Sequence, residues 1–121
     1  MRVALILALA LASPALAADP ETTFLDNCAA CHQAGGQGVP GAFPALAANP
    51  FVTGPADQVI NTVLNGRGGM PAFRDELSDE QLAGVIGYIR GGWGNRAKTV
   101  APADIAAERT APPKARSLQA H

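Results

Sequence analysis

The chain has 121 residues, which allows one domain with a modest hydrophobic core. It is 48% hydrophobic but only 5% aromatic, and its 13 Gly and 10 Pro are typical of a loop-rich protein. A formal net charge of -1 lacks the basic surplus needed to neutralise phosphates, so the composition argues against a nucleic-acid partner.

The N-terminal segment, residues 1–18, has the pattern of a secretory signal peptide. Arg2 provides the positive n-region, residues 3–12 are apolar, and Ala15-Leu16-Ala17 matches the small-residue cleavage pattern. The apolar run is shorter than the ~20 residues that span a bilayer, and Ser13-Pro14 interrupts it. We therefore expect export to the periplasm, cleavage of this segment and no stable membrane span in the mature chain.

Helical patterns account for most of the remaining chain, over about residues 20–30, 55–65 and 78–91. In each, apolar residues recur at three- and four-residue steps. The first two helices begin at or near a proline, and Ser78 with Gln81 forms a capping box for the third. Asn65-Gly66 and Gly91-Gly92 are stop signals. Because no alternating run reaches the length of a strand, the predicted fold is all-α.

Two segments lack this periodicity. Residues 33–44 are dense in Gly and Pro and are predicted to form an ordered loop. After Trp93 the sequence loosens, although residues 102–109 can form two further helical turns, and disorder is expected from Thr110 onward. The expected division is a signal peptide (1–18), one domain (19–95) and a basic, partly disordered C-terminal extension (96–121).

The first predicted helix ends in the pentad Cys28-Ala29-Ala30-Cys31-His32. In a Cys-x-x-Cys-His sequence the two thiols can form thioether bonds to the vinyl groups of haem, while the adjacent imidazole reaches the iron. Cysteines three positions apart share one helix face, so both can reach one porphyrin edge. The pentad therefore predicts one covalently attached haem c, with His32 as an iron ligand.

Other roles for the cysteines remain open at this point. A structural zinc site usually needs four Cys or His ligands, and beyond the pentad the chain offers only His121. A thioredoxin-like redox pair belongs after a strand in a βαβ unit, which the pattern lacks. A plain disulfide is compatible with export, but it leaves His32 without a role.

Met70 is the candidate for the second axial ligand of the iron. Once Met1 is removed it is the only methionine, and it lies in the glycine-rich stretch Gly66-Arg67-Gly68-Gly69-Met70-Pro71. A lone methionine ordinarily fills a gap in a core, but a rigid loop between two helices is a suitable place for a ligand. The flanking Arg67 and Arg74 can pair with haem propionates, dock a partner or simply be solvated.

Together these motifs resemble the class I cytochromes c over about residues 20–93. The landmarks are Phe24, the Cys28–His32 pentad, Phe43-Pro44-Ala45-Leu46 and Gly69-Met70-Pro71. The resemblance implies three main helices around one haem, a loose C-terminal tail, and crossing first and last helices at which Phe24 meets Tyr88 and Val85.

The resemblance also implies roles for individual residues. The carbonyl of Pro44 would accept the proton on His32 Nδ1, and haem iron would lie between His32 and Met70. The haem pocket would be lined by apolar side chains, namely Leu46, Val63, Leu64 and Phe73. The lysines around the haem edge of the best-known members are missing, since only Lys98 and Lys114 are present.

The implied function is a non-enzymatic electron carrier that accepts single electrons from a dehydrogenase and passes them to an oxidase or another acceptor. One alternative is a cytochrome c subunit of a periplasmic dehydrogenase complex, with the basic tail as its attachment arm. A further alternative, haem-ligand binding or peroxidase activity, requires Met70 to be off the iron.

Overall fold

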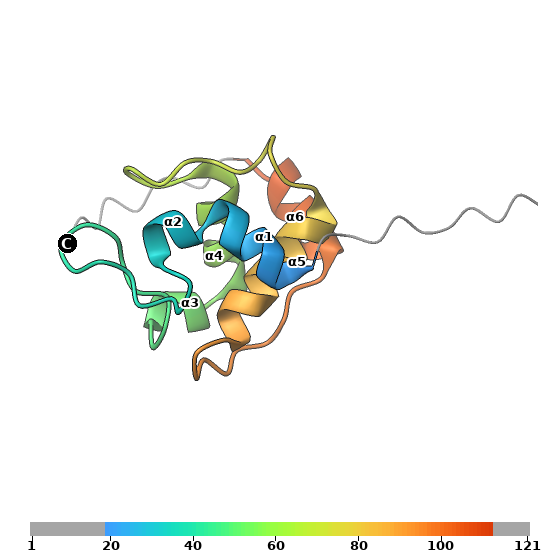
Figure 1. Ribbon diagram of the computed structural model, residues 1–121. Helices are drawn as coiled ribbons and strands as arrows, with labels where there is room; N and C mark the ends of the chain where they lie inside the picture. Colours follow the sequence, from blue (N-terminus) through green and yellow to red (C-terminus); the bar gives the residue numbers. More distant parts are fainter. Residues whose placement is uncertain (1–18, 113–121) are drawn as a thin grey trace, which may run out of the picture.

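The computed structural model describes residues 19–112, which form a helical fold without strands, as predicted (Figure 1). Its elements are α1 (Pro20–Asn27), α2 (Ala29–His32), α3 (Pro50–Thr53), α4 (Ala56–Asn65), α5 (Asp79–Gly91) and α6 (Pro102–Thr110). None of the helices in the described residues is long and apolar enough to cross a membrane. The predicted signal peptide and the end of the predicted tail, residues 113–121, lie outside the described residues.

The single helix predicted over residues 20–30 is in fact two. Asp19 caps α1 by accepting a hydrogen bond from the Thr22 N–H at 3.2 Å. At Cys28 the backbone leaves helical geometry, with φ -123° and ψ -35°, and α2 continues after this break to His32. The break therefore lies inside the Cys28–His32 pentad.

The other predicted caps are present. The Ser78 side chain accepts from the Gln81 N–H at 3.2 Å, and the Gln81 side chain accepts from the Ser78 N–H at 3.0 Å, which completes the capping box of α5. Helix α4 ends at Gly66, where φ is 73° and ψ is 173°. That backbone region is accessible essentially only to glycine.

The crossing of α1 and α5 forms the centre of the core (Figure 1). Phe24 is fully buried there, and its ring centroid lies 5.5 Å from that of Tyr88 and 5.1 Å from that of Trp93. These separations are typical of favourable aromatic pairs. The contact of Phe24 with Tyr88 is confirmed, and Trp93 joins it to form an aromatic cluster.

The helical turns predicted over residues 102–109 form α6, which packs against α4 and α5. Thr110, from which disorder is predicted, is the last residue of this helix. Ile105 is its fully buried anchor. The segment between α5 and α6 is also held in place, because Arg90 donates to the carbonyls of Lys98, Val52 and Gly54 at 2.8–2.9 Å. The chain after α5 thus folds back onto the helical core.

Candidate functional site

A cavity of about 390 Å3 lies between α2, α4, α5 and the two irregular loops. Cys28, Cys31, His32 and Met70 all line it, although they come from segments about forty positions apart in the sequence. The cavity is also lined by most of the predicted pocket residues, namely Pro44, Leu46, Val63 and Phe73. The fold thus gathers the candidate haem-attachment and iron-ligating residues around one largely apolar space.

His32 is fixed by a hydrogen bond between its ring and the loop. Its Nδ1 lies 2.8 Å from the Pro44 carbonyl oxygen, and the ring is 9% exposed. Because a carbonyl oxygen can only accept, Nδ1 carries the proton and donates it. Nε2 is then the nitrogen with a free lone pair, which is the state that a metal-ligating histidine requires.

The loop that supplies Pro44 is built on glycines. The carbonyl of His32 accepts from the Gly38 N–H at 2.9 Å, and Val39 and Phe43 exchange two backbone hydrogen bonds of 2.9 Å. Gly38 has φ +64°, and a Cβ placed on it would lie 2.5–2.7 Å from backbone atoms of residues 43–45. Only glycine therefore lets the backbone approach the Pro44 peptide this closely.

The two cysteines are free thiols on the same cavity. Burial, with the neighbouring Cys31 as the smaller cause, raises the pKa of the Cys28 thiol to about 11. Reactive thiols of redox-active CxxC pairs have a lowered pKa instead. Within residues 19–112 no three His, Cys, Asp or Glu side chains gather closely enough to hold a metal ion.

Met70 lies at the end of a tight turn and is half-buried. Its N–H donates to the Arg67 carbonyl at 2.9 Å, and its carbonyl accepts from the Arg67 N–H at 3.2 Å. Gly66 makes room for this turn, because a Cβ on Gly66 would lie 2.5 Å from the Met70 carbonyl oxygen. Each candidate iron ligand is thus backed by a glycine at positive φ.

Leu64 does not line the cavity, unlike the other predicted pocket residues. It is 1% exposed and belongs to the hydrophobic core. Successive helix residues are rotated by about 100°, and Leu64 lies on the side of α4 that faces the core. The cavity has further apolar lining residues that the sequence analysis did not assign to it: Phe43, Phe51, Val52, Val59, Leu77, Val85 and Ile89. Val59, Val85 and Ile89 carry a signal in hydrophobic periodicity, which does not distinguish core from pocket, whereas the other four lie outside the periodic segments.

The two arginines that flank Met70 differ in their surroundings. The Arg67 guanidinium carbon lies 5.8 Å from the centre of the Phe51 ring, at the cavity. Arg74 does not line the cavity; its guanidinium is bound to Asn65 and to the Arg109 carbonyl. Arg67 is therefore the one of this pair that lies near the site.

These observations fit a haem group. The cavity is apolar, two thiols lie on it three positions apart, and its histidine is held with Nε2 available. A methionine, the soft thioether ligand found opposite histidine in c-type haem proteins, lies on the same cavity.

Comparison with known proteins agrees with this chemistry. Residues 15–89 match the family described as cytochrome c oxidase, cbb3-type, subunit III. The chain is 43% identical over 70 residues to cytochrome c6 of Leptolyngbya boryana, a match that covers 54% of this chain and 80% of that protein. The fold resembles cytochrome c6C from Synechococcus, with a TM-score of 0.54 and 24% identity over 64% of this chain and 99% of that one.

The chain is also similar to larger proteins. It is 40% identical over 100 residues to the cytochrome c subunit of the quinone-dependent alcohol dehydrogenase of Gluconobacter oxydans, which covers 72% of this chain. The match spans only 21% of that subunit. From the family match, the cytochrome c6 relative and the shared helical fold, we conclude that the chain belongs to the class I c-type cytochromes, which carry covalently attached haem c.

Proposed function

We propose that the chain carries single electrons between redox proteins through a haem attached to Cys28 and Cys31, with His32 and Met70 as the axial ligands of its iron. The haem supplies reversible one-electron chemistry when bound. The protein contributes the attachment points, the two ligands and a pocket that excludes water.

Different residues on the cavity hold the two candidate ligands and form the apolar pocket. The Pro44 carbonyl holds the His32 ring in one orientation and one tautomer, and its hydrogen bond makes Nε2 a stronger donor. The turn that Gly66 allows, in the loop after α4, holds Met70 at the cavity. The apolar side chains around them, Leu46, Val63 and Phe73 among others, lower the local dielectric, which is one of the factors that set a haem potential.

The observation that carries the proposal is that both candidate ligands, His32 and Met70, line one cavity. If both side chains ligate the haem iron, no position would be left for a substrate or a gas, so the pair favours electron transfer over ligand binding or peroxidase activity. On this proposal the chain is an electron-transfer protein and not an enzyme.

The absorption spectrum of the purified holoprotein tests the ligand assignment. We expect a low-spin spectrum with the weak thioether-to-iron band in the far red, and no binding of carbon monoxide by the reduced protein at neutral pH. Met70→Leu keeps the apolar volume but removes the sulfur, and it should lose the band and bind carbon monoxide. A high-spin wild type, or carbon monoxide binding by the wild type, would contradict the proposal.

A second candidate function is that of a cytochrome subunit of a periplasmic dehydrogenase. It is favoured by the similarity to dehydrogenase cytochrome c subunits, which includes 38% identity over 114 residues, or 83% of this chain, to that of Pantoea cypripedii gluconate 2-dehydrogenase. The match covers 25% of that subunit. In either role we propose a dehydrogenase as the electron donor, an oxidase or similar protein as the acceptor, and the periplasm as the location.

Co-purification distinguishes the free carrier from the subunit. A tagged chain isolated from the periplasmic fraction should be recovered alone if it is a mobile carrier, and with a stoichiometric dehydrogenase if it is a subunit. Removing the basic segment 113–121 tests the attachment arm, because its loss should then release the dehydrogenase. Mass spectrometry of the same material should show an N-terminus at Ala18 or Asp19, whereas a retained Met1 would argue against export by signal cleavage.

A further inference from the structure

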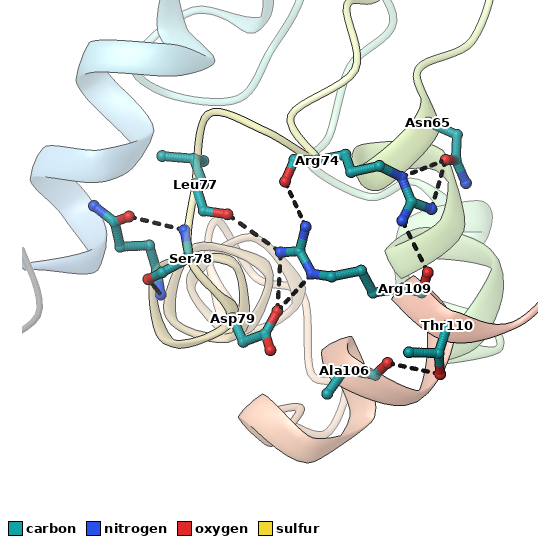
Figure 2. Close-up of polar contacts among 9 residues, drawn as sticks. Asn65, Arg74, Leu77, Ser78, Asp79, Ala106, Arg109 and Thr110 are labelled. Atoms are coloured by element: carbon teal, nitrogen blue, oxygen red, sulfur yellow. Dashed lines mark hydrogen bonds and ion pairs between the residues drawn. The ribbon is translucent and has the colours of Figure 1, made fainter.

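We propose that Arg109 of α6 is a positioning residue for the axial methionine, because it locks the loop that carries Met70 through a reciprocal contact with Arg74. This inference rests on the proposed function, in which Met70 binds the iron. We call the four residues Asn65, Arg74, Asp79 and Arg109 the arginine clasp; Figure 2 shows them with their neighbours.

One half of the arginine clasp is made by the Arg74 side chain. Its Nε and Nη2 both donate to Asn65 Oδ1, at 3.2 and 2.9 Å, and its Nη1 donates to the Arg109 carbonyl at 2.8 Å (Figure 2). The guanidinium thereby joins the last residue of α4 to the C-terminal end of α6. A carbonyl at a helix C-terminus carries partial negative charge, so a cation is favoured there.

The other half is made by the Arg109 side chain, which points back in the opposite direction (Figure 2). Nη1 donates to the Arg74 carbonyl, and Nη2 donates to the Leu77 carbonyl at 3.3 Å. Nε and Nη2 each lie 2.9 Å from Asp79 Oδ1, at the start of α5. The Arg109 and Asp79 side chains are 26% and 30% exposed, so water screens this ion pair only partly.

The arginine clasp closes both ends of the loop that presents Met70. The loop leaves α4 after Asn65 and rejoins the core where the Phe73 and Arg74 N–H groups donate to the Val63 and Leu64 carbonyls, at 3.0 and 3.2 Å. Arg74 binds Asn65 across the base of this loop. The Arg109 side chain binds the Arg74 carbonyl, and the Arg109 carbonyl binds the Arg74 side chain. Through these two contacts, α6 fixes the base of the Met70 loop.

A fixed base limits how far Met70 can move away from the cavity. For Met70 to leave the iron the loop must open, and an external ligand binds only to the opened fraction. The apparent affinity for such a ligand is therefore the intrinsic affinity reduced by that fraction. A weaker arginine clasp should increase the open fraction without replacing any side chain that lines the cavity.

Imidazole binding to the ferric holoprotein measures this open fraction. We expect Arg109→Gln to bind imidazole about tenfold more tightly than wild type, the effect of losing roughly one charge-assisted hydrogen bond from the closed loop. Arg74→Gln should have a similar effect from the other side of the contact. The double variant should bind imidazole more tightly than either single variant, because the two side chains make separate hydrogen bonds between the same two segments.

Two control variants separate positioning from general effects. Arg96→Gln removes the same charge at an exposed position outside the arginine clasp and should leave imidazole affinity unchanged. Phe24→Leu lowers stability at the α1–α5 crossing and should also leave it unchanged. Equal affinities in Arg109→Gln and wild type would overturn the inference, as would an equal gain in Phe24→Leu.

The wild-type spectrum keeps this inference separate from the proposed function. If the wild type lacks the far-red thioether band, the Met70 ligation fails and takes the inference with it. If the band is present in the wild type and Arg109→Gln binds imidazole no more tightly, only the inference fails.

Discussion

Gly38 offers a direct test of how the His32 side of the site is built. Replacing it with alanine places a Cβ 2.5 Å from the Phe43 carbonyl oxygen, 2.6 Å from the Pro44 carbonyl carbon and 2.7 Å from the Ala45 nitrogen. All three are backbone atoms, so the close contacts cannot be relieved by rotating a side chain. The 43–45 segment must move, and it carries the carbonyl that holds His32 Nδ1 at 2.8 Å.

The cost of Gly38→Ala has two parts. A side chain at φ +64° costs about 1 to 2 kcal/mol, and weakening the hydrogen bond from His32 Nδ1 to Pro44 adds about 1 kcal/mol. We expect the free energy of unfolding to fall by about 2 to 3 kcal/mol in denaturant titrations of the holoprotein. The reduction potential should rise, because a His32 ring that loses this bond donates less electron density and stabilises ferric iron less.

Gly41→Ala is the matched control for this prediction. Gly41 lies in the same loop at φ +78°, but a Cβ there meets nothing within 4 Å. Its replacement should therefore lower stability only by the cost of the positive φ, about 1 to 2 kcal/mol, and leave the potential unchanged. Equal losses of stability in the two variants, or an unchanged potential in Gly38→Ala, would refute the reasoning.

Three further predictions concern other strained or buried positions. Gly66→Ala should weaken the far-red thioether band, whereas Gly68→Ala, at φ +56° with nothing within 4 Å, should retain it; equal spectra would contradict this. Gln33 has φ 67° and ψ 154°, a region used almost only by glycine, so Gln33→Gly should raise the unfolding free energy by about 1 kcal/mol, measured in denaturant. Arg90→Met leaves three carbonyls without their donor and should cost about 3 kcal/mol, against little change for the exposed Arg96→Met in the same assay.

Local sequence signals were sufficient for α4 and α5 and for their ends, but they did not predict the short α3. The capping box at Ser78 and the stop at Gly66 are read from a few neighbouring residues, and the structure has both. The break at Cys28 was missed because apolar periodicity continues through it, and nothing local marks the change of backbone direction. The all-α class depended only on this periodicity and is confirmed.

The site residues that could be predicted are those that belong to a short motif or are a rare residue type. The pentad and Met70 stand out as residue types, and the structure places them on one cavity. Leu64 was predicted for the pocket but lies in the core, because the apolar stripe along α4 does not say which of its residues face the cavity. The pairing of Arg74 with Arg109 joins positions 35 residues apart. No pattern within either segment encodes that contact.

The way the chain folds back after α5 has a consequence for the order in which the holoprotein assembles. Trp93 packs where a Cβ on Gly36 would be, and Asn95 donates to the Leu46 carbonyl and accepts from the Ala48 N–H, so the histidine loop is braced from that later segment. The cysteine segment and these braces are 60 or more residues apart in the sequence, so the histidine loop is held only once residues 93–95 have docked. We therefore expect the thiols of Cys28 and Cys31 to be more accessible to covalent attachment before residues 93–95 dock against the histidine loop than afterwards.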